Sequence, residues 1–385
     1  MIASRALPAS AEVVIIGAGV IGASIAWHLC QRGCSDVVLL DGGEPGSGST
    51  SKATGGFRAQ FDTEVNIRLS LLSRAKLLRF HDEVGADPGF EQRGYLWLAT
   101  EEPELDRLRK AQTLQHATGL TEARMLTGSE TRAVQPALGP VAIAGAAYCP
   151  TDGFIRPVQI LDGYLRDAIR MGARLFPGQQ VRSLRRESES IARVECSEGG
   201  ITAGTVVNAA GSWAGDVGRM AGVDIPVTPR RRCVAVMEPS DLLPEEMPMT
   251  IFAEDGFHFR MRDGRLLLLR PGAGDDQLED SWIDALLETA AKRIPVIRGL
   301  RLDRLRCWDG LYEMSPDHHA IVGLAPGTKN FLLANGSSGH GVMHSPAIGQ
   351  IISEMILDGK SSVDVHALRP SRFAEGALNA TPSTI

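Results

Sequence analysis

Apolar and polar residues are arranged in different ways along this chain, and each arrangement predicts a kind of element. Residues 13–16 and 37–40 are short runs of apolar side chains, which are typical of buried strands. Between them, residues 23–31 have the pattern of a helix. The N-terminal part of the chain therefore predicts a strand, a helix and a second strand.

The turn between the first strand and the helix has the sequence G-x-G-x-x-G, formed by Gly17, Gly19 and Gly22. Gly17 permits a tight turn, Gly19 leaves room for a pyrophosphate, and Gly22 lets the helix pack close to the strand. Val20 and Ile21 begin the helix, whose N-terminal N–H groups and dipole favour negative charge. The motif predicts a dinucleotide site; the alternative is a chance Gly-rich turn.

Asp41 follows the second strand, 19 positions after Gly22. A carboxylate at this place accepts hydrogen bonds from the ribose hydroxyls of an adenosine. The loop that comes next, 42–61, is rich in Gly and Ser, so its backbone can approach a ligand closely. We predict a cofactor-binding loop rather than an ordinary surface loop. Its expected contact residues are Gly42, Ser49, Thr50, Ser51, Gly55 and Gly56.

Further helix and strand patterns continue through the middle of the chain. Helices are predicted at 63–83, 102–118 and 157–171; Pro157 opens the last and Gly172 closes it. Strands are predicted at 95–99, 144–148, 173–176, 181–185, 191–196 and 205–209.

The pattern changes after Pro226. Short strands are predicted at 233–237, 257–262 and 265–269, then a helix at 281–293 and a long strand at 301–313. Asp263 and Gly264 lie between the second and third strands and predict a type I′ hairpin. We interpret this part as an antiparallel sheet with helices on one face.

The first pattern returns near the C-terminus, with strands at 320–323 and 331–334, a Gly-rich turn at 335–341 and a helix at 345–357. The predicted fold class is therefore α/β: a Rossmann-like dinucleotide-binding domain assembled from discontinuous segments, plus an α+β substrate domain with an antiparallel sheet. We assign residues 1–85, 150–215 and 316–375 to the first domain, and 86–149 and 216–315 to the second.

Composition and charge narrow the class of protein. The 385 residues are 43% hydrophobic, enough for two domains with cores, and a net charge of −6 gives no basic field for nucleic acid. We see no signal-peptide pattern and no apolar run long enough to span a membrane. Six scattered cysteines favour reduced thiols in a cytoplasmic protein.

His318 and His319 lack a third ligand at suitable spacing, so no metal site is expected. The tail after Arg372 is expected to fray.

Five stretches, at 17–29, 152–175, 206–229, 310–323 and 338–349, carry a resemblance that spans nearly the whole chain. Together they resemble the D-amino-acid oxidase-like family of FAD-dependent oxidoreductases, nearest to sarcosine oxidase, glycine oxidase and the β subunits of sarcosine oxidase and proline dehydrogenase. The two C-terminal stretches, GLYEMSPDHHAIVG and SGHGVMHSPAIG, are the most specific. The resemblance implies FAD, a discontinuous second domain, and oxidation of an amino acid or amine.

The same resemblance implies further contacts with FAD. Reduced flavin gains negative charge at its pyrimidine end, and a helix N-terminus with free N–H groups stabilises that charge. The segment beginning at Ser338 would be such a helix end; a plain Gly-rich helix start is the alternative. The implied contact residues are Val181, Ala210, Gly211, Trp213, Gly310, Gly339, His340, Gly341, Val342 and Met343.

Four residues are candidates for the substrate site. The resemblance to sarcosine oxidase places a carboxylate-binding arginine at Arg58, and the planar guanidinium suits that anion. Arg270 follows a predicted strand and could project toward the flavin. His258 is a candidate base, although a structural histidine is the stronger interpretation. Tyr312 lies in a segment that lines the flavin in this family, and a core aromatic is the alternative.

Three departures from monomeric sarcosine oxidase alter the expected chemistry. Gly310 occupies the position of the cysteine that attaches FAD, and Cys307 lies three residues too early, so we expect non-covalent FAD. Leu266 and Met343 replace lysines that act on oxygen and on the substrate carboxylate. Oxygen and another electron acceptor therefore both remain open.

We thus expect hydride transfer from the C–N bond of a sarcosine-, glycine- or proline-like amino acid or secondary amine to flavin N5. Two alternatives remain. The chain could be the FAD-holding β subunit of a hetero-oligomeric amine dehydrogenase, with little activity without a partner subunit. It could instead be an NAD-dependent Rossmann dehydrogenase that uses only the opening glycine motif.

Overall fold

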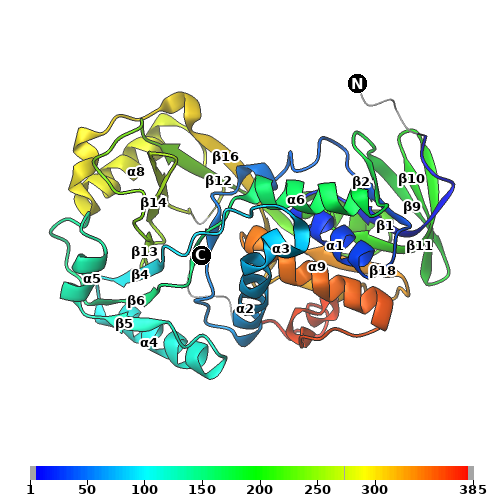
Figure 1. Cartoon of the computed structure of the whole chain (residues 1–385), viewed down its shortest axis with the longest axis horizontal. Coiled ribbons are helices and arrows are strands. Elements are labelled where there is room, and N and C mark those ends of the chain that lie inside the picture. The colour runs from blue at the N-terminus through cyan, green and yellow to red at the C-terminus, as the bar shows by residue number, and fades with distance from the viewer. Residues whose placement is uncertain (1–5, 273, 380–385) are drawn as a thin grey trace.

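The computed structural model describes residues 6–272 and 274–379. Within this part of the chain the strands form two eight-stranded sheets, which lie at opposite ends of the molecule in Figure 1. A small two-stranded sheet, β3 (Gly56–Phe57) with β7 (Gly153–Phe154), pairs segments that are far apart in the sequence.

The first sheet has the strand order β17-β18-β11-β1-β2-β8, and β10 and β9 extend it from β11. Parallel pairing joins β1 to β11 and β2, β11 to β18, and β2 to β8, so the sheet combines three separate parts of the chain. Its strands are β1 (Ser10–Ile16), β2 (Val37–Leu40), β8 (Arg174–Phe176), β9 (Val181–Glu187), β10 (Ser190–Cys196), β11 (Gly199–Asn208), β17 (Ile321–Leu324) and β18 (Phe331–Asn335).

Both faces of this sheet are buried, which explains the unbroken apolar runs. Val13 and Ile15 of β1 belong to one hydrophobic cluster, and Val14 and Ile16 belong to another, because successive side chains in a strand point to opposite faces. The first cluster includes α1 (Val20–Gln31), α2 (Glu64–Leu78), α3 (Phe80–Val84), α6 (Pro157–Arg170) and α9 (Gly341–Asp358); the second includes β9, β10 and α7 (Ala214–Met220).

The second sheet has the order β16-β12-β15-β14-β13-β4-β6-β5. Its pairs are antiparallel except β13 with β4, which is parallel. Its strands are β4 (Tyr95–Ala99), β5 (Arg124–Leu126), β6 (Gly145–Cys149), β12 (Thr228–Val236), β13 (Met249–Phe252), β14 (His258–Arg262), β15 (Arg265–Leu269) and β16 (Trp308–Met314).

Helices cover both faces of this second sheet, so the expectation of helices on one face was wrong. α8 (Asp280–Arg293) packs through Leu286 on the face that carries Leu268, whereas α4 (Glu102–Ala117) packs through Leu105 on the face that carries Trp97. A short helix, α5 (Gly128–Val134), follows β5. The face with Trp97 continues into the large cavity described below.

Several elements differ from the sequence pattern. The helix expected at 345–357 begins at Gly341, and the helix expected at 63–83 is divided between α2 and α3. Only Trp308–Met314 of the long run at 301–313 is a strand, because Arg304–Arg306 forms a 3₁₀ turn. The sequence also missed β13, which is four residues long. The type I′ hairpin is confirmed, since Asp263 and Gly264 have φ of 55° and 70°.

The C-terminal tail is fixed as far as Asn379, so fraying directly after Arg372 was a wrong expectation. Asn379 Nδ2 donates to Asp317 Oδ2 at 3.0 Å and to the Ala367 carbonyl at 2.8 Å. Residues 380–385 lie outside the described part of the chain.

The domain division remains a proposal, with one boundary revised by the packing. Val217, Ala221, Val223 and Ile225 pack in the core of the first sheet, although we assigned 216–315 to the substrate domain. This packing moves the boundary toward the start of β12.

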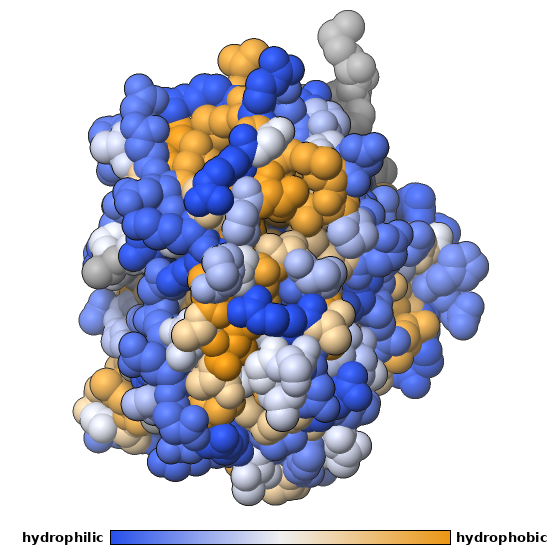
Figure 2. Space-filling view, turned by 90° about the vertical axis from the view of Figure 1, so that its left-hand side faces the viewer, coloured by the Kyte–Doolittle hydropathy of each residue, from blue (hydrophilic) through white to orange (hydrophobic). Residues whose placement is uncertain are grey.

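None of the helices in the described residues is both long and apolar enough to cross a membrane. The end face next to the second sheet mixes hydrophobic areas with hydrophilic side chains (Figure 2).

Candidate active site

The glycine turn forms a cradle between β1 and α1. Gly17 has φ of 107°, and a Cβ there would lie 2.3 Å from the Ala209 carbonyl oxygen. A Cβ at Gly22 would lie 1.9 Å from the Gly17 carbonyl oxygen, so α1 packs directly on the turn. Only glycine fits at these two positions, as the motif predicted.

Asp41 and Thr50 hold the cradle in shape. Asp41 Oδ2 accepts a hydrogen bond from Ala18 N at 2.8 Å, and Oδ1 accepts one from Gly43 N at 2.9 Å. Thr50 Oγ1 accepts from Val20 N at 3.1 Å, which fixes the cofactor loop against the start of α1. Because a carboxylate has about four acceptor positions, Asp41 retains lone pairs for a ligand hydroxyl.

A single cavity of about 650 Å³ connects this cradle to the substrate candidates. Of the predicted FAD contacts, Gly22 and Ser51 do not line it; Gly22 acts in packing, and Ser51 N donates to the Gly46 carbonyl. The predicted contacts that line it are Gly17, Gly19, Val20, Ile21, Asp41, Gly42, Ser49, Thr50, Gly55, Gly56, Val181, Ala210, Gly211, Trp213, Gly310, Gly339, His340, Gly341, Val342 and Met343.

The N-terminus of α9 forms another part of the cavity wall. Ser338 and Gly339 have φ of 50° and 94°, and a Cβ at Gly339 would lie 2.5 Å from the Tyr312 ring. Pro346 lies inside the helix and has no N–H for the Val342 carbonyl, so Ser345 Oγ donates to that oxygen instead, at 2.8 Å. The helix therefore starts at the cavity, four residues earlier than expected.

These residues fit FAD. The cavity joins two helix N-termini, which favour a pyrophosphate and a charged flavin pyrimidine, to a carboxylate suited to ribose. The cradle of Gly17 and Gly22 admits backbone approach that a Cβ would prevent. The substrate candidates Arg58, His258 and Tyr312 line the same cavity.

Arg58 is 5% exposed and lies between aromatic rings. Its guanidinium carbon is 4.1 Å from the ring centre of Phe61 and 4.9 Å from that of Trp97. Its Nη1 donates to the Gln60 carbonyl at 3.0 Å, and its Nη2 contacts His340 Nε2 at 3.1 Å. Because arginine only donates, His340 Nε2 is the acceptor in this bond and the proton of the neutral ring lies on Nδ1.

Burial lowers the pKa of Arg58, although nearby tyrosines and carboxylates oppose that shift. Burial raises the pKa of Tyr95 to about 12, against the effect of Arg58 and Arg260. The pKa of Tyr312 is also raised by burial. At neutral pH the site therefore combines a guanidinium with protonated phenols, which suits an anionic ligand group.

His258 lines the cavity as a neutral ring. Its Nδ1 lies 2.8 Å from the Gly256 carbonyl, to which it donates, so Nε2 is an acceptor. Burial is the main cause that lowers the pKa of His258 to about 4; the Gly256 hydrogen bond opposes this shift and the charge of Arg58 adds to it. An imidazole with this pKa accepts hydrogen bonds at neutral pH but rarely takes up a proton, which argues against His258 as a catalytic base.

Arg270 does not join the other candidates. Its Nε is 3.2 Å from Asp255 Oδ2, its Nη1 donates to Thr289 Oγ1 of α8, and it is not among the described residues lining the cavity. Arg270 directly follows β15, and its side chain contacts α8. The expectation that Arg270 projects toward the flavin was therefore wrong.

Gly310 lies beside Lys52 in the cavity wall. A Cβ at position 310 would be 2.7 Å from Lys52 Cβ, so a larger side chain would displace the loop. Cys307 lies away from the cavity lining; its Sγ donates to the Asp303 carbonyl. Among the described residues, no group of three or more His, Cys, Asp or Glu side chains could hold a metal ion.

The sequence interpretation missed Tyr95 and Trp97, which line the cavity from β4, and Met249 and Ile251, which line it from β13. One signal was present for the first pair: two aromatic residues at i and i+2 on a predicted strand share a face. For the second pair the signal was absent, because β13 itself was not recognised.

Comparison with known proteins agrees with this geometry. The profile of the FAD dependent oxidoreductase (DAO) family matches residues 12–355. Human mitochondrial dimethylglycine dehydrogenase is 30% identical over 392 residues, which cover 95% of this chain and 44% of that protein. Glycine oxidase of Geobacillus kaustophilus (strain HTA426) is 29% identical over 366 residues, covering 92% of this chain and 95% of that protein.

Solved structures show the same fold. The crystal structure of L-proline dehydrogenase from P. horikoshii aligns with a TM-score of 0.90 and 29% identity, covering 97% of this chain and all of that chain. The chain thus spans less than half of the dimethylglycine dehydrogenase that it matches, but the whole of this shorter neighbour.

Proposed function

Because this chain belongs to the FAD dependent oxidoreductase (DAO) family and is an FAD-dependent enzyme, we propose that it oxidises the C–N bond of a small amino acid or secondary amine, of the sarcosine, glycine or proline type. The observation that carries this proposal is the buried Arg58 in the cavity that continues from the dinucleotide cradle. The related proteins act on dimethylglycine, glycine and L-proline, as their names state, which supports a substrate of this size.

Arg58 binds the substrate carboxylate in this proposal. An anion buried in the cavity requires a compensating charge, and the planar guanidinium can make two parallel hydrogen bonds to a carboxylate. The rings of Phe61 and Trp97 hold the guanidinium plane, so little side-chain entropy is lost when the substrate binds.

The other residues orient the amine. FAD, when bound in the cavity, would supply the acceptor for the hydride on the carbon next to the substrate nitrogen. His258 Nε2 accepts a hydrogen bond from a substrate N–H, and the Tyr95 and Tyr312 hydroxyls donate hydrogen bonds into the same cavity. Together with Arg58 they fix the reacting C–H in one direction, which lowers the entropic part of the barrier.

Anaerobic flavin bleaching tests this function. The purified holoprotein is mixed with N-methylglycine, N,N-dimethylglycine, glycine and L-proline, and loss of the flavin absorption is followed. Pyrrolidine and dimethylamine, which lack the carboxylate, are the matched controls. We expect at least one carboxylate compound to bleach the flavin faster than its control. Equal rates for both groups would contradict the role of Arg58.

We also propose that FAD binds without a link to a cysteine sulfur, because Gly310 offers no thiol and Cys307 lies outside the cavity lining. Acid precipitation should release all yellow colour into the supernatant. Colour that stays on the pellet would contradict this part of the proposal.

Of the two alternatives from the sequence, the NAD-dependent dehydrogenase is not retained, because the family uses FAD. The FAD-holding subunit of a larger enzyme remains a second candidate, favoured by the greater length of dimethylglycine dehydrogenase. Bleaching by the chain expressed alone would favour an independent enzyme, whereas bleaching only with a partner would favour the subunit. Oxygen or another electron acceptor, and a cytoplasmic location, stay predictions.

A further inference from the structure

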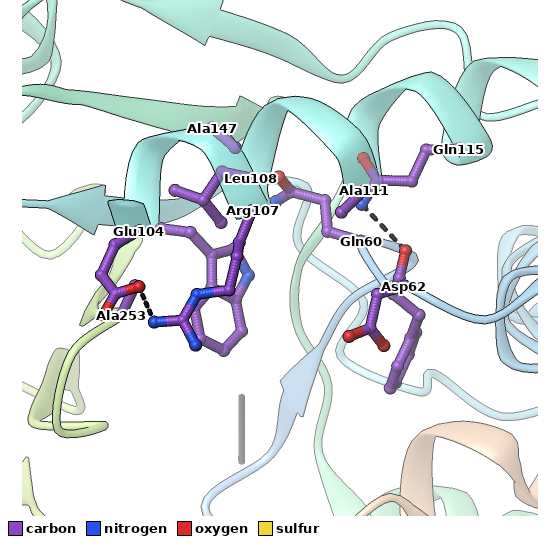
Figure 3. A pocket seen from close by; sticks show the side chains of 11 residues that line it. Gln60, Asp62, Glu104, Arg107, Leu108, Ala111, Gln115, Ala147 and Ala253 are labelled. Carbon is purple, nitrogen blue, oxygen red and sulfur yellow. Dashed lines mark hydrogen bonds and ion pairs between the residues drawn. The ribbon is translucent and has the colours of Figure 1, made fainter. Parts of the chain in front are cut away.

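A second, smaller cavity of about 30 Å³ lies between α4 and the segment 60–62 (Figure 3). Glu104 and Arg107 of α4 form an ion pair at one end of it, and Gln115 of α4 lies toward the other end (Figure 3). Trp97 belongs to the walls of both this cavity and the large one. The small cavity and the candidate active site therefore share the Trp97 side chain as part of their walls.

Four buried polar atoms on side chains that line this small cavity have no hydrogen-bond partner within the described part of the chain; one of them, Glu104 Oε2, belongs to the ion pair with Arg107, which leaves three without a polar partner. They are Gln60 Oε1, Gln115 Oε1 and Trp97 Nε1. The side chains that carry them are 3%, 3% and 2% exposed. A buried polar atom without a partner is costly, so three around one cavity favour the binding of a small polar molecule there.

The chemistry of the three atoms is fixed by their other contacts. Gln60 Nε2 donates to the Tyr95 carbonyl at 3.0 Å, and Gln115 Nε2 donates to the Phe61 carbonyl at 3.0 Å. A carbonyl oxygen only accepts, so neither amide can be reversed, and both Oε1 atoms are acceptors. Trp97 Nε1 can only donate.

We propose that this cavity binds water, with one molecule held by all three side chains, and that the bound water positions Arg58. A water molecule that accepts from Trp97 Nε1 and donates to both glutamine oxygens satisfies all three atoms. About 10–15 Å³ of such space suffices for one water, so the cavity is large enough. The positioning role rests on the proposed function of Arg58.

The link to Arg58 is direct, because the residues around the small cavity also hold the guanidinium. Gln60 supplies the carbonyl that accepts from Nη1, and Phe61 and Trp97 supply the two rings that flank the guanidinium carbon. Loss of the water would free the Trp97 indole and the 60–61 segment to shift, and Arg58 would move with them. Gln115 is then a positioning residue that acts on the substrate site from α4.

The test uses Gln115→Met, with Gln112→Met as its matched control. Gln112 lies on the same helix, and its Nε2 donates to the Ala123 carbonyl at 3.0 Å, but it does not line the small cavity. Both variants therefore lose one amide–carbonyl hydrogen bond of the same kind. High-resolution crystal structures of the parent holoenzyme and both variants are compared.

In the parent and in Gln112→Met we expect density for a water within hydrogen-bond distance of Gln60 Oε1, Gln115 Oε1 and Trp97 Nε1. In Gln115→Met the water should be lost and the Arg58 guanidinium displaced. Absence of the water from the parent structure would overturn the proposal, as would a displaced water with an unmoved Arg58. This readout does not depend on enzymatic activity.

The kinetic readout uses the carboxylate substrate that bleaches the flavin. Gln115→Met should raise KM about fivefold, the equivalent of one hydrogen bond, with a smaller change in kcat, whereas Gln112→Met should leave KM unchanged. An unchanged KM in Gln115→Met while Arg58→Ala raises it would overturn the positioning role. If Arg58→Ala also leaves KM unchanged, the failure lies in the proposed function, and the crystal structures alone decide the water site.

Discussion

Two of the three buried arginines among the described residues, Arg372 and Arg58, are held in contrasting ways. Arg372 is 0% exposed, and its Nε and Nη2 donate to the two carboxylate oxygens of Asp317, each at 2.9 Å. Arg58 is 5% exposed and contacts a carbonyl, a histidine and two aromatic rings in the wall of the large cavity.

The difference shows that burial of an arginine does not by itself define the role of that side chain. The fork of Arg372 is matched by a carboxylate of the chain itself, which joins the C-terminal segment to the β16–β17 connection. Arg58 lies where a ligand carboxylate can reach it. We therefore expect Arg372 to act on stability and Arg58 to act on substrate binding.

Breaking the Arg372 pair should have the largest effect. Arg372→Met leaves Asp317, 1% exposed, as a buried charge with weaker partners, so unfolding free energy should fall by about 3–5 kcal/mol. Chemical denaturation followed by circular dichroism measures this. The double variant Arg372→Met/Asp317→Leu should recover most of the loss, and a double variant as unstable as the single one would contradict the explanation.

Substitution of Arg58 should affect catalysis rather than stability. Arg58→Ala should reduce kcat/KM by the equivalent of about 2–5 kcal/mol, as for a truncated buried ion pair. Arg58→Lys keeps the charge but loses the fork, so it should raise KM more than it changes FAD content. Steady-state kinetics and flavin absorption measure both.

Arg270→Ala is the matched control for Arg58, because Arg270 pairs with Asp255 away from the large cavity. It should keep the parental kcat/KM. Parental kinetics in Arg58→Ala together with a loss in Arg270→Ala would reverse our assignment of the carboxylate-binding arginine.

The comparison extends to carboxylates with a smaller effect. Asp317 is used inside the fold, whereas Asp41 lines the cavity and retains lone pairs toward it. Asp41→Ala should weaken FAD affinity by about 1–3 kcal/mol through loss of ribose hydrogen bonds and of cradle contacts. Titration of the apoprotein with FAD measures this, and unchanged affinity would count against the ribose assignment.

The smallest expected effect is the pH dependence of stability that the Arg372–Asp317 pair contributes. Burial alone would raise the pKa of Asp317, but hydrogen bonds from Arg372 and Asn379 outweigh it and hold the pKa well below its usual range. The contribution of the pair is therefore complete above about pH 4, the pKa of an unfolded Asp, and is lost as pH falls further.

Denaturation of the parent and of Arg372→Met/Asp317→Leu at pH 3, 4 and 7 checks the direction of this pH dependence. The parent should lose more stability than the double variant between the upper and lower values. A parallel decline of both proteins would show that other carboxylates dominate acid unfolding.

Local sequence was sufficient for the parts of the site that lie on one turn. Gly17, Gly19 and Asp41 could be predicted because the backbone geometry of a strand–turn–helix unit fixes them within a short segment. Arg58 and the start of α9 came from the family resemblance, and both line the cavity. Gly22 was assigned its packing role for the same local reason.

The misplacement of Arg270 and the omission of Trp97 had a different origin. Trp97 lies on β4 and Arg270 directly follows β15, and both of these strands were correctly predicted. Which face of each strand meets the cavity depends on the pairing of β13 with β14 and with β4, and β4 is distant from both in sequence. Pattern alone cannot give the pairing of a four-residue strand such as β13.

The sequence by itself determined the α/β fold class, the dinucleotide turn and the family, because these depend on apolar periodicity and on glycines within short segments. The tertiary structure alone decided which arginine faces the large cavity and which is matched by Asp317, and it brought α4 behind Arg58. These outcomes depend on contacts between residues that are far apart in the sequence, such as Arg372 with Asp317 and Gln115 with Phe61, and burial determines how much each charge contributes.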